Sequence, residues 1–455
     1  MLRRAPILVG LIALGCAGET SSQGLALSLG GPAIHFFVTG TEVTESFLPE
    51  AVHVRLTGLP PASRVTLRAS MPGYASHAGF RADAEGSVDV AAQAPLEGTY
   101  QGADADGLFW SMVATAAPPA SPSEDIDVTV RAEVDGAEVA TATLARHAVA
   151  GGLVETEVRD DGLFATFVTP ATPGPHPALL TFGGSEGGIS TGLKVARLYS
   201  SLGYSCLGLA YFKEDGLPPE LGAIPLEYFG KALAWMQARP EVKADAIGVL
   251  GASRGGELAL ILGATNPAVK AVVAHVPSGV SWPGSDPQHP EKEGSAWTLG
   301  GHGLPFVSAG DTTPVFTTDA QGRTIEDDTP AFLAALAATS PATLAAATTR
   351  VEKARGPVLM LAAGDDEIWP SCKLARIAMD RLVAAGHAAS FADDLQCYPG
   401  AGHVLGVPGL PTTDPQLFQG AGDVWIALGG TPAGVAHAAR DAFERKRGFL
   451  AAALR

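Results

Sequence analysis

The hydrophobic pattern of the chain changes near residue 150, and this change limits the folds that the chain can adopt. From about residue 52 to residue 144, apolar and polar residues alternate in short segments. The clearest segment is "DIDVTVRAEVDGAEVATATL" (125–144), in which Asp135-Gly136 supplies a two-residue turn between two alternating runs. Alternation of this kind buries one side of each strand. Short strands with Gly and Pro between them predict a β-sandwich.

Beyond about residue 152, continuous apolar runs separated by helical stretches replace the alternation. Such runs are typical of strands buried on both faces, and strands that alternate with helices predict a mostly parallel sheet with helices on both faces. Because 455 residues exceed one ordinary core, we expect two domains, a sandwich at 30–150 and an α/β domain at 152–455. The apolar runs are "ALLTF" (178–182), "SCLGLAY" (205–211), "AIGVL" (246–250), "AVVAHV" (271–276) and "VLMLAAG" (358–364).

The N-terminus has the layout of a secretory signal. Arg3 and Arg4 precede the apolar run "ILVGLIALG", which is too short to span a bilayer and ends at Cys16. The end of this run, "IALGC", resembles a bacterial lipobox, although Ala13 stands where Leu is usual. We therefore predict a signal peptide over 1–16, a lipid anchor at Cys16 and an exported lipoprotein. The alternatives are plain signal cleavage nearby, or a cytoplasmic protein if the segment is not a signal.

Charge and cysteine content bear on which ligands the chain binds and on whether it forms disulfides. The formal net charge is −17 and no basic cluster occurs, which argues against nucleic-acid binding. No Cys/His spacing resembles a zinc site, and we expect neither a metal nor a cofactor. Besides Cys16 the chain has only Cys206, Cys372 and Cys397, an odd set that predicts no disulfide framework.

The pattern G-x-S-x-G, typical of a nucleophilic serine in a strand-to-helix turn, occurs three times. Only Ser253 has both a strand before it ("AIGVL") and an apolar helix after it ("GELALILGA"). Ser190 has no preceding strand, so its match is attributed to chance. Ser185 follows the strand "ALLTF" but is followed by more glycines. We interpret "FGGSEGG" as an oxyanion loop with Gly184 or Ser185 as N–H donor, beside the N–H of Arg254. A flexible glycine turn is the alternative.

A nucleophilic serine requires a base and an acid, which follow in the order Ser, Asp, His in this class of sheet. Asp365 and Asp366 come directly after a buried strand. Asp366, four residues before Pro370, has the more favourable spacing, although either carboxylate could instead cap the loop. His403, in "LQCYPGAGHVL", follows a short strand and a glycine turn. Among the other histidines, His275 ends a core strand and is interpreted as structural.

From about residue 45 to the C-terminus, the chain resembles the acyl-CoA thioesterase/bile acid-CoA:amino acid N-acyltransferase family. The elbow alone is weak evidence, but the motifs occur in order across most of the chain. They are "RVTLRASM", "FRADAEGSVDV" and "GLFWSM", followed by "LAYFKEDGLPPEL", "IPLEYFGKALAWMQARPEV", "GASRGGELAL", "GDDEIWPS", "CYPGAGH" and "GGTPAGVAHAARDAFERKRGFL".

The resemblance implies an α/β-hydrolase preceded by an Ig-like β-sandwich, with Ser253 as nucleophile, Asp366 as acid and His403 as base. Members with Cys at the nucleophile position tend to transfer the acyl group to an amine, whereas serine members hydrolyse the thioester. Ser253 therefore favours hydrolysis of acyl-CoA to a fatty acid and CoA. Familiar members are intracellular, which conflicts with the predicted export. The alternatives are an exported carboxylesterase or acyl hydrolase, an acyltransferase to an amine, or a binding protein with an inert hydrolase.

Overall fold

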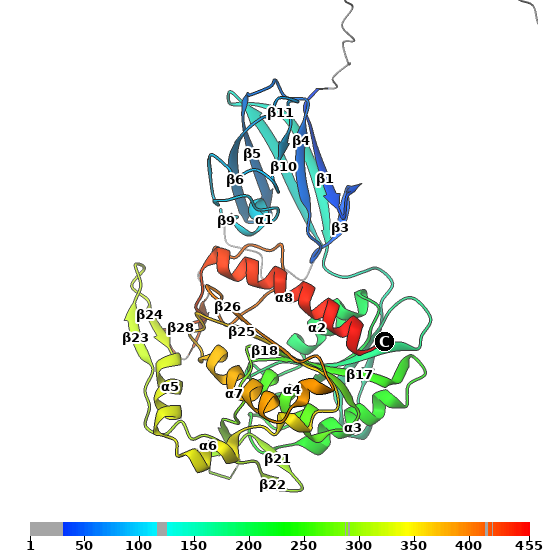
Figure 1. Cartoon of the computed structure of the whole chain (residues 1–455), viewed down its shortest axis with the longest axis vertical. Coiled ribbons are helices and arrows are strands. Elements are labelled where there is room, and N and C mark those ends of the chain that lie inside the picture. The colour runs from blue at the N-terminus through cyan, green and yellow to red at the C-terminus, as the bar shows by residue number, and fades with distance from the viewer. Residues whose placement is uncertain (1–30, 116–124, 287, 290–291, 415–416, 421) are drawn as a thin grey trace, which may run out of the picture.

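The computed structural model describes two domains, stacked along the long axis in Figure 1. The predicted signal peptide and Cys16 lie outside the described residues. The described residues are 31–115, 125–286, 288–289, 292–414, 417–420 and 422–455.

The N-terminal domain is a sandwich of two sheets, as the alternating pattern predicted. Alternate residues such as Leu56 and Leu67 are fully buried between the sheets. The expected hairpin turn is present, with positive φ at both Asp135 and Gly136. One sheet has the order β2 (Thr41–Val43), β1 (Ala33–Val38), β4 (His53–Thr57) and β7 (Val88–Asp89). The other has β3 (Glu45–Phe47), β11 (Ala137–His147), β10 (Ile126–Val134), β5 (Arg64–Met71), β6 (Tyr74–Arg81) and β8 (Glu97–Gly98), with β9 (Val113–Ala114) beside β6; α1 (Gly107–Trp110) follows β8 in the chain.

The second domain is built on an eight-stranded sheet whose last six strands run parallel. Its order is β12 (Val154–Val158), β13 (Phe164–Thr169), β15 (Ser205–Ala210), β14 (His176–Phe182), β17 (Val242–Ala252), β18 (Val269–His275), β25 (Val358–Ala363) and β26 (Asp394–Tyr398). This mostly parallel sheet, with helices on both faces and a serine at the sharp turn after β17, is the α/β-hydrolase fold. The strand interpretation of the five apolar runs is confirmed.

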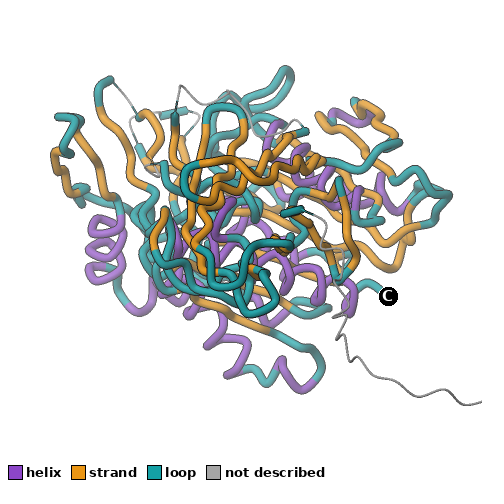
Figure 2. Tube along the Cα trace, turned by 90° about the horizontal axis from the view of Figure 1, so that it is seen from above, coloured by secondary structure: helices purple, strands orange, loops and turns teal. Residues whose placement is uncertain are grey.

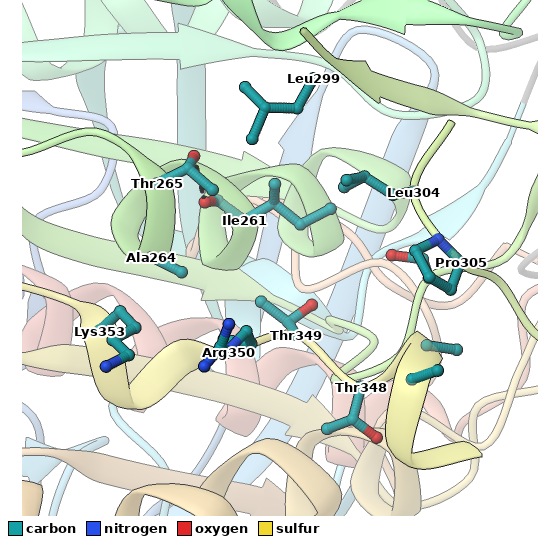
Figure 3. A pocket seen from close by; sticks show the side chains of 13 residues that line it. Ile261, Ala264, Thr265, Leu299, Leu304, Pro305, Thr348, Thr349, Arg350 and Lys353 are labelled. Atoms are coloured by element: carbon teal, nitrogen blue, oxygen red, sulfur yellow. Dashed lines mark hydrogen bonds between the residues drawn. The ribbon is translucent and has the colours of Figure 1, made fainter. Parts of the chain in front are cut away.

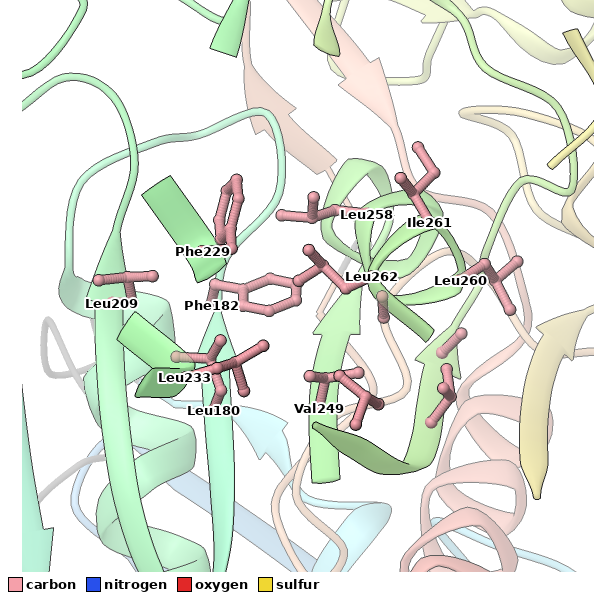
Figure 4. Close-up of a cluster of buried hydrophobic side chains, with 14 of the residues drawn as sticks. Leu180, Phe182, Leu209, Phe229, Leu233, Val249, Leu258, Leu260, Ile261 and Leu262 are labelled. Atoms are coloured by element: carbon pink, nitrogen blue, oxygen red, sulfur yellow. The ribbon is translucent and has the colours of Figure 1, made fainter. Parts of the chain in front are cut away.

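Helices pack on both faces of this sheet, and Figure 2 shows the helices in purple and the strands in orange. The helices α3 (Leu226–Gln237), α4 (Arg254–Thr265) and α7 (Ser371–Ala384) pack on one face, where Phe182, Phe229 and Leu258 meet in one core (Figure 4). The helices α2 (Ser190–Ser201) and α8 (Pro432–Ala453) pack on the other face around Tyr199 and Leu450. Ser190 therefore begins α2 and does not form a second elbow.

An insertion between β18 and β25 adds short strands and two helices that the sequence pattern did not reveal. The strands are too short and polar to show a period. They are β19 (Pro283–Ser285), β20 (Glu293–Ser295), β21 (Trp297–Leu299), β22 (His302–Gly303), β23 (Val315–Thr318) and β24 (Thr324–Asp327), joined by β16 (Ile224–Pro225), β27 (Leu417–Gln419) and β28 (Val424–Ala427). The helices are α5 (Thr329–Ala338) and α6 (Pro341–Ala347), and short 3-10 turns lie at Asp160–Gly162, Val351–Lys353 and His387–Ala389. No single described helix is long and apolar enough to cross a membrane, and only α5 and α6 together, bent by 118°, meet that test by length and composition.

Helix α8 also contacts the sandwich domain, next to α1 (Figure 1). His437 Nε2 lies 2.7 Å from Asp104 Oδ2, and Arg440 Nε lies 2.7 Å from Asp106 Oδ2. The hydrogen bond to Asp104 raises the pKa of His437. One helix therefore contacts both the eight-stranded sheet of the second domain and the N-terminal domain.

The expectation about the cysteines was wrong in one respect. Cys372, near the start of α7, and Cys397, in β26, form a disulfide with Cα atoms 5.6 Å apart. They are 25 residues apart in sequence, and α7 returns the chain to the strand beside β25. Cys206 is buried and free. The odd count concealed a single pair because the pairing depends on the fold of the intervening helix.

Replacing both Cys372 and Cys397 by alanine should lower the free energy of unfolding by about 3 kcal/mol, because the 25-residue loop of the unfolded chain is no longer closed. The measurement is the urea midpoint of the catalytic domain without reductant. As a control, dithiothreitol should lower the midpoint of the wild type and leave that of the double variant unchanged. Equal midpoints for the two oxidised proteins would contradict the stabilising role.

Candidate active site

Ser253 lies at the sharp turn between β17 and α4. Its backbone has φ 57° and ψ −123°, a strained conformation for a residue with a side chain. The turn requires glycine on both sides of the serine. A Cβ on Gly251 would come within 2.3 Å of the carbonyl oxygen of Gly255, and a Cβ on Gly255 within 2.4 Å of that of Gly183. The close approach of these backbones explains why the motif has glycine at positions 251 and 255.

His403 pairs with Asp366. Its Nδ1 lies 2.9 Å from Oδ1 and 3.0 Å from Oδ2 of Asp366, whose side chain is only 1% exposed. The N–H groups of Ile368 and Trp369 donate to the same carboxylate over 3.0 and 3.2 Å and fix its position. Asp365, the alternative acid, is exposed to solvent. The geometry leaves His403 Nε2 as the ring nitrogen available to a reacting group.

The predicted residues gather at one edge of the sheet. Ser253, Asp366 and His403 follow the carboxyl ends of β17, β25 and β26, and β18 lies between β17 and β25. The carboxyl ends of neighbouring parallel strands share an edge, where ligands bind in open α/β sheets. At the end of β18, the carbonyl oxygen of His275 accepts the N–H of Ser253 over 3.0 Å. Burial lowers the pKa of the His275 ring well below its usual value, so the ring stays neutral.

The loop after β14 packs against the elbow, as expected for an oxyanion loop. A Cβ on Gly184 would lie 3.2 Å from the Cβ of Ser253. The N–H of Gly184, however, donates to Oε2 of Glu186 over 3.0 Å. The N–H of Ser185 has no acceptor among the described residues. Arg254 opens α4, where the N–H groups have no acceptor within the helix. Of the three donors considered, those of Ser185 and Arg254 are free.

The side chain of Arg254 has a separate role from its N–H. Its Nη2 donates to the carbonyl oxygen of Trp282 over 3.0 Å, and its Nε lies 3.5 Å from Oε2 of Glu257. Glu257 is fully buried, and its Oε1 accepts a hydrogen bond from Nε1 of Trp297 over 2.6 Å. Burial raises the pKa of Glu257 to about 7, an effect that Arg254 opposes. These contacts connect α4 to the insertion between β18 and β25. The sequence signal was a glutamate inside the otherwise apolar "GELALILGA".

An aromatic cluster beside His403 was also missed. The ring of Trp369 lies 6.0 Å from that of His403, and Phe332 of α5 lies 5.9 Å from Trp369 and 4.6 Å from Trp282. Trp369 Nε1 donates to the carbonyl oxygen of Val276 over 3.0 Å. The rings come from three separate segments, so sequence spacing could not group them.

Other possible ligand sites in the domain do not include the predicted residues. A cavity of about 320 Å³ lies at the far end of α4, and neither Ser253, Asp366 nor His403 lines it. Its walls combine apolar and cationic side chains (Figure 3). In the part of the chain that the structure describes, no group of three or more His, Cys, Asp or Glu side chains could hold a metal ion. The residues that line the cavity at the far end of α4 are Ile261, Ala264, Thr265, Ser281, Leu299, Leu304, Pro305, Ala346, Ala347, Thr348, Thr349, Arg350 and Lys353.

Comparison with known proteins assigns both domains. Residues 49–160 match the model described as "Acyl-CoA thioester hydrolase/BAAT N-terminal region", and residues 224–455, just over half of the chain, match "BAAT / Acyl-CoA thioester hydrolase C terminal". Acyl-coenzyme A thioesterase 1 of Rattus norvegicus is 30% identical over 424 residues, covering 88% of this chain and 93% of the relative. Peroxisomal succinyl-coenzyme A thioesterase of Mus musculus is 28% identical over 390 residues, covering 81% and 86%.

Among solved structures, the alpha/beta hydrolase GrgF from Penicillium sp. sh18 is 15% identical and gives a TM-score of 0.37, covering 66% of this chain and 98% of that chain. The family resemblance noted in the motifs is confirmed by the two model matches and by the relatives. The chain therefore belongs to the BAAT/acyl-CoA thioester hydrolase family and is a thioesterase-like hydrolase.

Proposed function

We propose that the protein hydrolyses acyl-CoA thioesters to a free acid and CoA, with Ser253 as nucleophile, His403 as base and Asp366 as acid. The observation that carries the proposal is the buried Asp366–His403 pair at the sheet edge that also holds the strained Ser253. Relatives named as acyl-coenzyme A thioesterases over most of the chain support the substrate class.

In the first half of the reaction, Ser253 Oγ attacks the thioester carbonyl carbon while His403 Nε2 takes the hydroxyl proton. The negative oxygen of the tetrahedral intermediate accepts N–H groups at the elbow and the loop after β14. The carbon–sulfur bond then breaks, and the CoA sulfur leaves with the proton from His403. Asp366 holds the ring in the required tautomer and stabilises its positive charge.

In the second half, water attacks the acyl ester on Ser253. His403 takes a proton from the water and returns it to Ser253 Oγ as the ester bond breaks, which releases the acid. Hydrolysis requires that water, and not an amine, reaches the acyl-enzyme. Ser253 supports hydrolysis because serine members of the family hydrolyse the thioester.

Three alternatives use the same chain differently. An exported carboxylesterase would act on an oxygen ester with the same residues, and an acyltransferase would give the acyl group to an amine. A binding protein would use the sandwich and leave Ser253 idle. The paired Asp366 and His403 argue against idleness, since Asp366 is buried and its carboxylate is held by two N–H groups in addition to His403.

We also propose export, with Cys16 as the anchor. The disulfide between Cys372 and Cys397 supports export, though not the anchor itself, because disulfides persist mainly in oxidising compartments. Radioactive palmitate should label the wild type and leave Cys16→Ser unlabelled. Equal labelling of both proteins would exclude the anchor at this residue. A cell fractionation that finds both proteins in the cytoplasm would exclude export.

Replacing Ser253 by alanine should abolish acyl-CoA hydrolysis, because it removes the hydroxyl that the proposed mechanism acylates. The measurement compares CoA release from acyl-CoA with p-nitrophenol release from p-nitrophenyl esters. Ester turnover without CoA release would favour the carboxylesterase. Product analysis with glycine present distinguishes free acid from amide and so tests transfer to an amine. Activity retained by Ser253→Ala would refute the mechanism.

Asp366→Asn should lower kcat about 10⁴-fold, because an amide stabilises the wrong His403 tautomer. Asp365→Asn is the matched control, since Asp365 is the adjacent carboxylate and is exposed. It should leave kcat within about twofold, as surface substitutions usually do little. The measurement is kcat for acyl-CoA at saturating substrate. A larger loss in Asp365→Asn than in Asp366→Asn would reassign the acid.

A further inference from the structure

The loop after β14 has few unoccupied N–H groups. Between residues 184 and 189, the N–H of Gly184 donates to Glu186, that of Gly187 to the carbonyl oxygen of Gly184, and that of Gly188 to that of Phe212. The N–H of Ile189 donates to Oε1 of Glu214. The N–H groups of Ser185 and Glu186 have no acceptor in the described chain. Both residues are exposed beside the elbow, so these two N–H groups are open to solvent or to a ligand.

Tyr211 determines which way these peptides face. Its hydroxyl lies 3.0 Å from the carbonyl oxygen of Gly183 and 3.2 Å from that of Gly184. A trans peptide is planar, so its N–H points away from its carbonyl oxygen. Holding the two carbonyl oxygens at Tyr211 therefore turns the N–H groups of Gly184 and Ser185 to the opposite side. Glu186 takes the first of these N–H groups and leaves the second free.

Building on the proposed function, we propose that Tyr211 and Glu186 are positioning residues of the oxyanion hole. Tyr211 aims the N–H of Ser185 at the carbonyl oxygen of an acyl group on Ser253. Glu186 holds the N–H of Gly184, so that Ser185 and Arg254, and not Gly184, supply the two donors. The sequence left Gly184 and Ser185 as equal candidates, and these contacts choose between them.

The environment of Tyr211 suits this role. It is buried among Phe182, Phe229 and Trp297, with ring centroids 5.5–6.3 Å away, which fixes the ring without the hydroxyl. Burial raises the pKa of Tyr211, with Glu186 adding to the effect, so the hydroxyl stays protonated and able to donate. The backbone carbonyl oxygen of Glu186 accepts Nζ of Lys213 over 3.2 Å, which anchors the far side of the turn.

Tyr211→Phe removes only the hydroxyl and should lower kcat about 10- to 100-fold with KM within twofold. The reason is that an oxyanion donor acts in the transition state and not on the bound substrate. Affinity for a trifluoromethyl ketone analogue, whose adduct with Ser253 carries an oxyanion, should fall by the same factor. Affinity for the product acid, which forms no adduct, should stay within twofold.

Tyr228→Phe is the matched control. The Tyr228 hydroxyl donates to the carbonyl oxygen of Ala210 over 2.7 Å and accepts the N–H of Phe164 over 3.0 Å, beside the same core and without touching the loop. It should change thermal stability as Tyr211→Phe does and leave kcat within twofold. If kcat falls by the same factor in both variants, or falls in neither variant, the role of Tyr211 is overturned.

Glu186 is tested by a conservative pair. Glu186→Ala frees the N–H of Gly184 and should lower kcat about tenfold, whereas Glu186→Gln keeps an acceptor oxygen and should restore kcat to within about threefold. Glu214→Ala, which removes the comparable bond to Ile189, should leave kcat within about twofold. A rise in kcat in both Glu186 variants would mean that the carboxylate blocks the hole, and would overturn its assigned role.

Ser253→Ala, measured in the same assays, separates the two levels of the argument. If Ser253→Ala keeps its activity, the proposed mechanism at Ser253 fails, and the oxyanion hole assigned to it fails with it. If Ser253→Ala is inactive and both Tyr211→Phe and Glu186→Ala resemble the wild type, the function stands and only the positioning role fails.

Discussion

The strained turn at Ser253 is the constraint on which the rest of the site depends. A side chain at φ 57° persists only where the surroundings hold the backbone in place. Here the N–H of Ser253 is bonded to His275 in the next strand, and the two flanking glycines allow β17, α4 and the loop after β14 to meet without clash. The parallel sheet then brings Asp366 and His403 to the same edge. The local strain is thus supported by the hydrogen bond to β18 and by the close backbone packing of β17, α4 and the loop after β14.

The buried charges next to the turn connect it to the insertion. Arg254 and Glu257 lie one turn apart on α4, and their outer partners are Trp282 and Trp297. Hydrogen bonds to Trp282 and Trp297 hold the buried side chains of Arg254 and Glu257 in position. The insertion therefore cannot shift without disturbing the helix whose N-terminus faces the reacting group. The insertion and α4 are therefore joined by these buried hydrogen bonds.

Sequence patterns predicted what depends on periodic burial. The sandwich strands, the five core strands and the elbow at Ser253 all follow from spacing along one segment. The structure adds contacts that join distant segments through side chain and backbone. Tyr211 bonds a loop 27 residues earlier, Cys372 pairs with Cys397, and β24 pairs with β28 about 100 residues later. None of these leaves a period in the sequence, because each depends on where the fold returns the chain.

One stretch of backbone, from His403 to Thr431, connects His403 to the sandwich domain. The N–H of His403 donates to the carbonyl oxygen of Leu428 over 2.6 Å. Just before α8 begins, the N–H of Thr431 donates to the carbonyl oxygen of Gly400 over 2.8 Å. Between these points the chain reaches the N-terminal domain, where the N–H of Thr412 donates to the carbonyl oxygen of Trp110 over 3.0 Å.

The segment that carries His403 is therefore held at its base by the catalytic domain and at its middle by the sandwich. Arg440 and His437, on the helix that follows, bind Asp106 and Asp104 of the same domain. A histidine that must take and return a proton needs a fixed ring position relative to Ser253, since a small displacement costs rate steeply. In the proposed mechanism, the hydrogen bond from Thr412 to Trp110 adds to the restraint on the segment that carries His403. This gives a physical reason for the two domains to occur in one chain.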